Sequence, residues 1–205
     1  MHEILAQLIE GVPFSGDIQQ DMQAFLEFHG CPKTALHCRQ VAAQAKQLAA
    51  RFAADEASAE VAGWLHDISA ATPTGRRAVI ARSLNLPVLP EEEAFPMLLH
   101  QKLSAVIARE LFGVTDVAAL SAIGCHTTLK ADASLLDKVV FVADKIAWDQ
   151  PGEPPYLKEM LAALEHSLDR AALCYLDYLW QRRVQLPGPF HPWALAALNQ
   201  LKILA

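Results

Sequence analysis

Six ionisable side chains stand out because they lie on or beside the apolar stripes of expected helices, where polar groups are uncommon. In chain order they are His37, His66, Asp67, His100, His126 and Asp144. Burying imidazole and carboxylate groups without partners costs free energy, and bound divalent cations would satisfy several of them together. Because both groups are good ligands for manganese, iron and zinc, the pattern indicates a metal centre.

A structural role is the competing interpretation. A single helical histidine more often bonds a backbone carbonyl than a metal, and an adjacent His-Asp pair is common by chance. The order of all six residues therefore carries the hypothesis. We expect the remaining histidines to be structural or exposed, and Cys125 to be a small buried hydrophobe.

Helices are expected almost everywhere, because apolar residues recur at helical spacing and the alternating β-branched runs typical of strands are missing. The residues that could bind metal fall on helices that start near residues 34, 58, 99, 115 and 135. We expect Ser58 and Thr115 to cap two of these helices. Ser134 and Asp137 resemble a capping box for the helix that carries Asp144.

Prolines divide the rest of the chain. Three prolines and an acidic run between residues 87 and 96 predict a connection, and residues 151–155 predict a break. One long helix is expected over residues 157–184, and a last helix after Pro192. We predict an all-α, single-domain helical bundle over residues 1–205, in which C-terminal helices at about 157–204 pack on a core at about 34–148.

The composition suits one globular domain, since 53% of the 205 residues are hydrophobic and 20% are charged. The formal net charge of -6 gives no general attraction for nucleic acid or anionic lipid, so neither partner is expected. A metal would reconcile an acidic chain with an anionic small-molecule substrate.

Several features favour a cytoplasmic protein. The four cysteines form no CxxC pair, and the first ten residues lack the pattern of a signal peptide. The longest stretch without formal charge, residues 184–201, contains three prolines and is a poor membrane span. An apolar face of the last helix is a candidate surface for a homodimer.

With these residues in place, the sequence resembles the HD superfamily of metal-dependent phosphohydrolases, and within it the YqeK-type symmetrical diadenosine tetraphosphate hydrolases. The similarity extends over nearly the whole chain. The stretches that carry it are His37 to Asp67, the single His100, Ala122 to Thr127, and Leu135 to Ile146. Together they are much more specific than an HD dipeptide.

The resemblance implies two divalent transition metals, with iron or manganese suggested by the family. One metal would be held by His37, His66, Asp67 and Asp144, and Asp67 would bridge to a second metal held by His100 and His126. Asp67 would thus be both a ligand and the catalytic organiser. In such a site a water activated by two metals attacks phosphorus, and the YqeK-type reaction yields two molecules of ADP.

Three departures from the family pattern concern the substrate pocket. The family often has a lysine where this chain has Ala70, and a Glu-Pro-x-Arg stretch where this chain has residues 147–150. After His126-Thr127, the usual Ser/Thr-Gly becomes Thr128-Leu129. The metal ligands are complete, whereas the substrate pocket is not standard.

Replacement phosphate contacts could come from residues near the expected mouth of the site. The candidates are Thr127, Lys145, Arg76, Arg77 and Lys130. For each cation a solvated surface position is the alternative, and for Thr127 a bond to backbone. Trp148 could stack on a base or pack against the C-terminal helices.

Three functions are compatible with these residues. The first is hydrolysis of a dinucleoside oligophosphate such as diadenosine tetraphosphate, and the second is hydrolysis of another nucleotide at the same metals. The third is a nucleotide-binding sensor that retains metal with little turnover. Because a degenerate domain would be expected to lack some ligands and all six are present, the sequence favours an enzyme.

Overall fold

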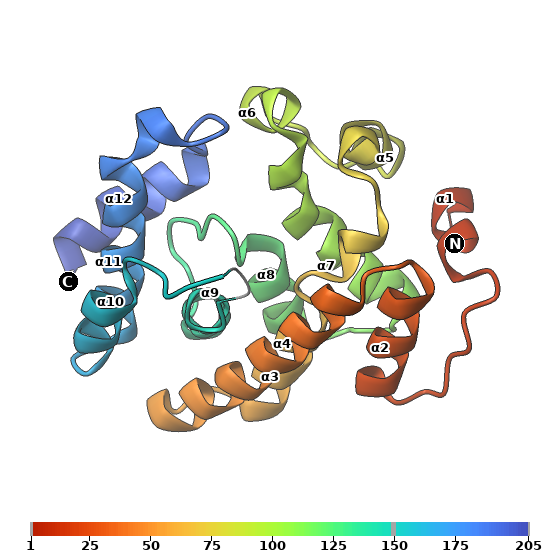
Figure 1. Cartoon of the computed structure of the whole chain (residues 1–205), viewed down its shortest axis with the longest axis horizontal. Coiled ribbons are helices and arrows are strands. Elements are labelled where there is room, and N and C mark those ends of the chain that lie inside the picture. Colours follow the sequence, from red (N-terminus) through yellow and green to blue (C-terminus); the bar gives the residue numbers. More distant parts are fainter. Residues whose placement is uncertain (1, 149–150, 205) are drawn as a thin grey trace.

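A computed structural model describes residues 2–148 and 151–204, which form twelve α-helices and no strand (Figure 1). The all-α prediction is confirmed. The helices are α1 Glu3–Ile9, α2 Ile18–Phe28, α3 Pro32–Phe52, α4 Glu56–Leu65, α5 Arg77–Ser83, α6 Pro90–Ala94, α7 His100–Leu111, α8 Val117–Cys125, α9 Leu135–Ile146, α10 Leu157–Leu164, α11 Leu168–Gln181 and α12 Pro192–Leu204. Four short 3-10 helices are η1 Ile68–Ala71, η2 Thr74–Arg76, η3 Pro96–Leu99 and η4 Arg183–Gln185.

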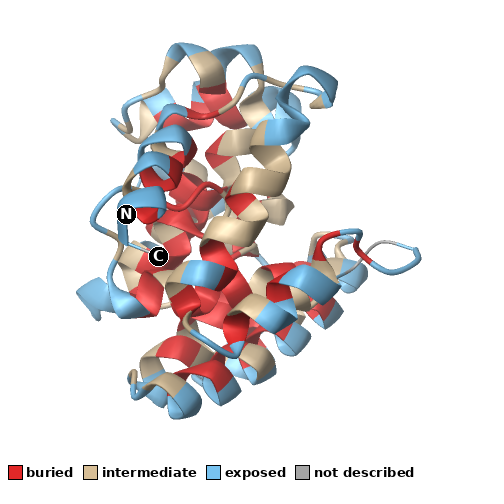
Figure 2. Ribbon diagram, turned by 90° about the vertical axis from the view of Figure 1, so that its left-hand side faces the viewer, coloured by how far each residue is buried: buried red, intermediate tan, exposed pale blue. Residues whose placement is uncertain are grey.

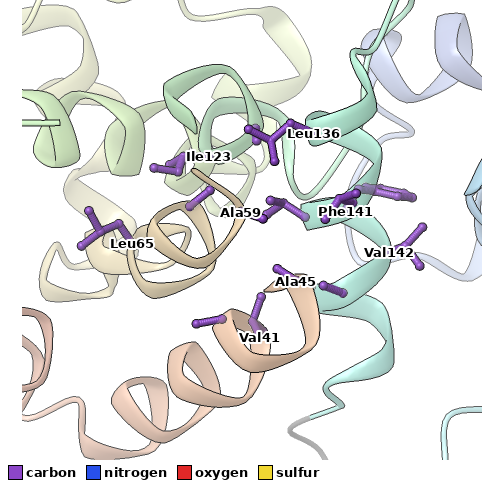
Figure 3. Close-up of a cluster of buried hydrophobic side chains, with 14 of the residues drawn as sticks. Val41, Ala45, Ala59, Leu65, Ile123, Leu136, Phe141 and Val142 are labelled. Atoms are coloured by element: carbon purple, nitrogen blue, oxygen red, sulfur yellow. The ribbon is translucent and has the colours of Figure 1, made fainter. Parts of the chain in front are cut away.

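The centre of the molecule is formed by α3, α4, α8 and α9, whose apolar faces meet. Figure 3 shows Val41 and Ala45 of α3 facing side chains of the other helices, with Phe141 of α9 among them. These three residues are fully buried. In Figure 2 the buried stretches line the inner sides of the helices and the exposed stretches face outward. Buried apolar side chains of α1–α4 and α7–α12 belong to one cluster, and a second, smaller cluster joins α5, η3 and α7.

The packing of α3 against α4 depends on Gly63. A Cβ atom at this position would lie 2.4 Å from the Cα atom of Ala42, closer than packed atoms approach. Glycine therefore lets the two backbones come together. This close contact between the two backbones sets the distance of the C-terminal end of α4 from α3.

The C-terminal helices pack at one end of the bundle. Helix α11 contacts α9 and is covered by α10 and α12, and Figure 1 shows these helices at the opposite end of the long axis from α1. In the described part of the chain, no helix combines the length and the apolar character that crossing a membrane requires.

Two predicted helix caps are wrong. Asp55 rather than Ser58 caps α4, and its side chain accepts a hydrogen bond from the Ser58 backbone N–H. Asp116 rather than Thr115 caps α8. An aspartate caps about as well as serine and better than threonine. An acidic residue therefore starts each helix, three positions before Ser58 in α4 and one position after Thr115 in α8. The capping box of Ser134 and Asp137 is confirmed.

The predicted helix over residues 157–184 is also wrong, because the chain interrupts it after Leu164. Ser167 has extended backbone angles, and its side chain accepts a hydrogen bond from the Arg170 N–H at the start of α11. A serine that caps a new helix offers the backbone an alternative to continuing the old one. The expected connection near residues 87–96 contains the short helix α6.

Candidate metal centre

Helix ends bring the six ionisable side chains to one place. His37 lies in the second turn of α3 and Asp144 in the last turn of α9. The others lie at or beside helix termini: His66 and Asp67 after α4, His100 at the start of α7, and His126 after α8. The close contact at Gly63 and the capped helices fix where these termini meet.

One side of the cluster joins His37, His66 and Asp144. The Nε2 atom of His37 lies 3.0 Å from Asp144 Oδ1 and 3.2 Å from His66 Nε2. His66 Nε2 is 3.6 Å from the same Asp144 oxygen. The side chains of His37 and His66 are buried, so this side of the cluster is largely shielded from water.

The other side joins His100 and His126, whose Nε2 atoms are 3.0 Å apart. Asp67 lies between the two sides. Its Oδ1 atom is 3.4 Å from His100 Nε2 and 3.5 Å from His126 Nε2, and its Oδ2 atom is 3.7 Å from His66 Nε2. Three sets of ligand atoms in the cluster, each within 4.8 Å, could hold a metal ion.

The hydrogen bonds of the histidines reveal which ring nitrogens carry protons. The Nδ1 atoms of His66, His100 and His126 lie 2.9, 2.6 and 2.8 Å from backbone carbonyl oxygens. Since a carbonyl can only accept, each Nδ1 donates, and in the neutral ring the Nε2 atom then carries a lone pair. Two such lone pairs face each other across 3.0 Å between His100 and His126. A divalent cation fits this donor set, because it would accept both lone pairs.

Burial and charge favour the protonation states that metal ligands need. Burial lowers the pKa of His66 and that of His100 to about 4. Burial would raise the pKa of Asp67, but the neighbouring histidines outweigh it and hold the pKa well below its usual range. Lys145 and His37 do the same for the pKa of Asp144. The neutral imidazoles of His66 and His100 therefore lie beside the ionised carboxylates of Asp67 and Asp144 at neutral pH.

A small cavity opens onto the cluster. Its walls are His37, Asp67, Asp144, Lys145, Ala147, Trp148, Tyr156 and Tyr175. Trp148 is partly exposed and packs edge-on against Tyr156, so one residue both lines the cavity and contacts the C-terminal part of the chain.

Of the five candidate substrate contacts, Thr127 and Lys145 join the cluster, Lys130 and Arg76 do not, and Arg77 is buried at the start of α5. The Thr127 hydroxyl lies 2.7 Å from His100 Nε2, and Lys145 pairs with Asp144 on the cavity wall. Lys130 instead contacts Ser121 and lies 3.3 Å from Asp137 Oδ2. Arg76 is exposed at the end of η2.

The departures from the family pattern have local consequences. Leu129 has a φ of 56°, in the left-handed region that favours glycine, and its side chain is fully buried. Packing of that side chain offsets the free-energy cost of the left-handed backbone, at a position where the YqeK-type family has glycine. Residue 70 is a partly buried alanine. Asp149 and Gln150, which belong to the departure at residues 147–150, lie outside the described residues.

Sequence reasoning missed Gln101 and Tyr175. Gln101 is fully buried, and its Oε1 atom accepts hydrogen bonds from the backbone N–H groups of Thr127 and Thr128. It thereby fixes the loop that follows His126. A polar residue next to His100 on the buried side of a helix was the available signal. Tyr175 had none, because its place on the cavity wall depends on how α11 packs on α9.

Comparison with known proteins agrees with this geometry. Residues 34–149 match the family model described as HD domain. The chain is 42% identical to an uncharacterized protein in the pepC 5' region of Lactococcus lactis subsp. cremoris, over 72% of this chain and 74% of the relative. It is 32% identical to a symmetrical bis(5'-nucleosyl)-tetraphosphatase of Bacillus subtilis, over 67% of this chain and 73% of the relative.

A solved structure has the same fold. It is described as a predicted HD superfamily hydrolase involved in NAD metabolism from Clostridium acetobutylicum, with a TM-score of 0.83 and 25% identity over 91% of this chain and 97% of that chain. The matched family model spans more than half of this chain and contains all six clustered residues. The chain therefore belongs to the HD-domain family and is an HD-domain hydrolase.

Proposed function

We propose that this protein is a metal-dependent phosphohydrolase that splits diadenosine tetraphosphate symmetrically into two molecules of ADP. The observation that carries the proposal is the facing pair of Nε2 lone pairs of His100 and His126, with Asp67 beside both. A cation between these facing acceptors would offset the free-energy cost of burying them without full partners. The named activity of the Bacillus subtilis relative supports the substrate.

Two divalent transition metals, iron or manganese, would be held by the six clustered residues. His37, His66 and Asp144 would hold one, His100 and His126 the other, and Asp67 both. When bound, such cations acidify a nucleophilic water and stabilise negative charge on phosphoryl oxygens.

The protein side chains orient the reactants. The hydrogen bonds from three Nδ1 atoms to backbone carbonyls hold the ring planes. The Thr127 hydroxyl, 2.7 Å from His100 Nε2, would donate to a phosphoryl oxygen once that nitrogen has another partner. Lys145 adds a buried positive charge beside Asp144.

The size of the cavity limits which part of a substrate enters it. Its volume is about 190 Å³, below the roughly 300–1,000 Å³ of typical ligand sites. The reacting phosphates would fit inside, and the nucleosides would extend past Trp148 at the rim. An extended oligophosphate with groups at both ends suits this shape.

The test combines metal analysis with product analysis on one purified sample. We expect about two equivalents of transition metal per chain and ADP as the only product from diadenosine tetraphosphate. ATP together with AMP would contradict symmetrical cleavage. Absence of transition metal after reconstitution would contradict the six-residue site.

A second substrate is favoured by one observation, the missing cation at residue 70. A panel of nucleoside mono-, di- and triphosphates, assayed beside diadenosine tetraphosphate, separates the two. Higher kcat/KM for a panel member would move the substrate to that nucleotide and keep the mechanism. Tight binding without turnover would instead identify a metal-retaining nucleotide sensor.

A further inference from the structure

Arg77 is a buried cation that no carboxylate neutralises within the described part of the chain. It is the first residue of α5, and only 6% of it is exposed. Its Nε atom donates to Thr72 O at 3.3 Å, and its Nη1 atom contacts Met97 O at 3.4 Å and Met97 Sδ at 3.1 Å. No carboxylate among the described residues lies within ion-pair distance of it.

This environment is unusual for arginine. A guanidinium remains charged under all ordinary conditions, and a buried charge is costly unless it is paired. Carbonyl oxygens satisfy some of its donors but carry no full negative charge. A thioether is only a weak acceptor, and Met97 is 41% exposed, so an incoming oxyanion could displace it.

The position of Arg77 points to the metal cluster. Met97 O, which Arg77 contacts, also accepts the hydrogen bond from His100 Nδ1 at 2.6 Å. The guanidinium and the His100 ring therefore meet at one oxygen atom. Burial lowers the pKa of Arg77 and the charge of Asp67 opposes that shift, so the two groups are within electrostatic reach. Residue 70, on the chain after Asp67, offers no cation of its own.

We propose that Arg77 is a substrate-binding residue whose guanidinium holds phosphate oxygens of the nucleotide beside His100 and Asp67. This inference rests on the proposed function and names a residue for it. Planar guanidinium and phosphate groups can form two parallel hydrogen bonds, which a single ammonium group cannot reproduce. The chain thus supplies a phosphate contact ten residues after Asp67, from a separate helix.

The test measures ADP binding and hydrolysis with metal-loaded wild type, Arg77→Gln and Arg77→Lys. Loss of a charged hydrogen-bonding group predicts about 10- to 100-fold weaker ADP binding for Arg77→Gln, a matching rise in KM, and unchanged metal content. Arg77→Lys keeps the charge and lacks the fork, so a smaller loss is expected. If Arg77→Gln does not fold, the ADP affinity of Arg77→Lys still tests the proposal.

Arg82→Gln is the matched control, because Arg82 lies on the same helix, is exposed and pairs with Glu93. It should bind ADP like the wild type. Unchanged ADP affinity in both Arg77 variants would overturn the proposal. So would loss of metal from Arg77→Gln with full ADP affinity, which would assign Arg77 to holding His100 through Met97.

Failure of the proposed function gives a different result. A wild type that hydrolyses no nucleotide but loses ADP binding on Arg77→Gln would refute the hydrolase and support the Arg77 contact. If the wild type and both Arg77 variants all hydrolyse diadenosine tetraphosphate at the same rate, the hydrolase is supported and the Arg77 contact is refuted.

Discussion

Two buried ionic clusters lie beside α7, and they are built on opposite principles. Glu92 of α6 is fully buried, accepts hydrogen bonds from the Leu89 N–H at 2.8 Å and from Lys102 at 2.8 Å, and lies 3.3 Å from His191 Nε2. The second ring nitrogen of His191 accepts from Trp193 N–H, so Nε2 is free to donate to the carboxylate. These acceptors each face a donor.

The metal cluster lacks that balance. The Nε2 atoms of His100 and His126 face each other and Asp67 Oδ1, while the Nδ1 atoms of both rings donate to backbone carbonyls. Burial of polar groups is common to both clusters, so burial alone does not identify a site. The balance of donors and acceptors separates a structural cluster from one that needs a cation.

The largest expected effect comes from Asp67→Ala. Removal of the carboxylate between both groups of histidines should lower phosphohydrolase activity by well over the roughly 100-fold typical of losing an outer contact to a metal ligand. Metal content, measured by mass spectrometry, should fall, while helical content by circular dichroism should stay near the wild type. Full activity in this variant would refute the mechanism.

Metal removal should distinguish the clusters directly. A metal present at about 1,000 times its dissociation constant stabilises the folded state by about 4 kcal/mol. Chelation should therefore lower the free energy of unfolding by that order, measured by urea denaturation before and after dialysis. Reloading with manganese should restore it. No change on chelation would place the metal cluster in the same class as the Glu92 cluster.

Glu92→Gln should break the balanced cluster without touching the other. Removing one partner of a buried ion pair typically costs about 3–5 kcal/mol, and the free energy of unfolding at pH 7 should fall by that order. Metal content should be unchanged. Loss of metal in this variant would show that the two clusters are coupled through α7.

The same cluster gives a pH dependence. Burial would raise the pKa of Glu92, but hydrogen bonds from His191, Leu89 N–H and Lys102 lower it, and the net shift is downward. The ionised carboxylate therefore adds stability above its unfolded pKa of about 4.3, and this stability is lost as the pH falls through the lower folded pKa. The difference in the free energy of unfolding between the wild type and Glu92→Gln should become smaller at acidic pH. A constant difference from pH 7 to pH 3 would contradict this.

The smallest effect is expected for Gly63→Ala, which tests how helix packing positions His66. The added Cβ would meet the Ala42 backbone at 2.4 Å, and overpacking of this kind costs about 1–3 kcal/mol. Gly63 O also accepts from His66 Nδ1, so metal affinity should fall as well. Gly75→Ala, where nothing lies within 4 Å, is the control and should change neither quantity.

The sequence by itself determined the helical class and the six residues of the cluster. Helical spacing of apolar residues is local, and the order of histidines and aspartates is distinctive enough to be read without coordinates. Ser134 and Asp137 were likewise readable, because a capping box is a local device. The caps at Asp55 and Asp116 were missed because neighbouring polar residues compete for one role.

Only the tertiary structure decided which of the candidate cations are buried and which are exposed. Arg76 and Arg77 are adjacent in sequence, yet one is exposed and the other is buried beside the carbonyl shared with His100. Gln101 holds the loop after His126, and Tyr175 lines the cavity, through the packing of α7 and α11. The physical reason is that burial and donor–acceptor pairing depend on contacts between distant segments, which local periodicity does not specify.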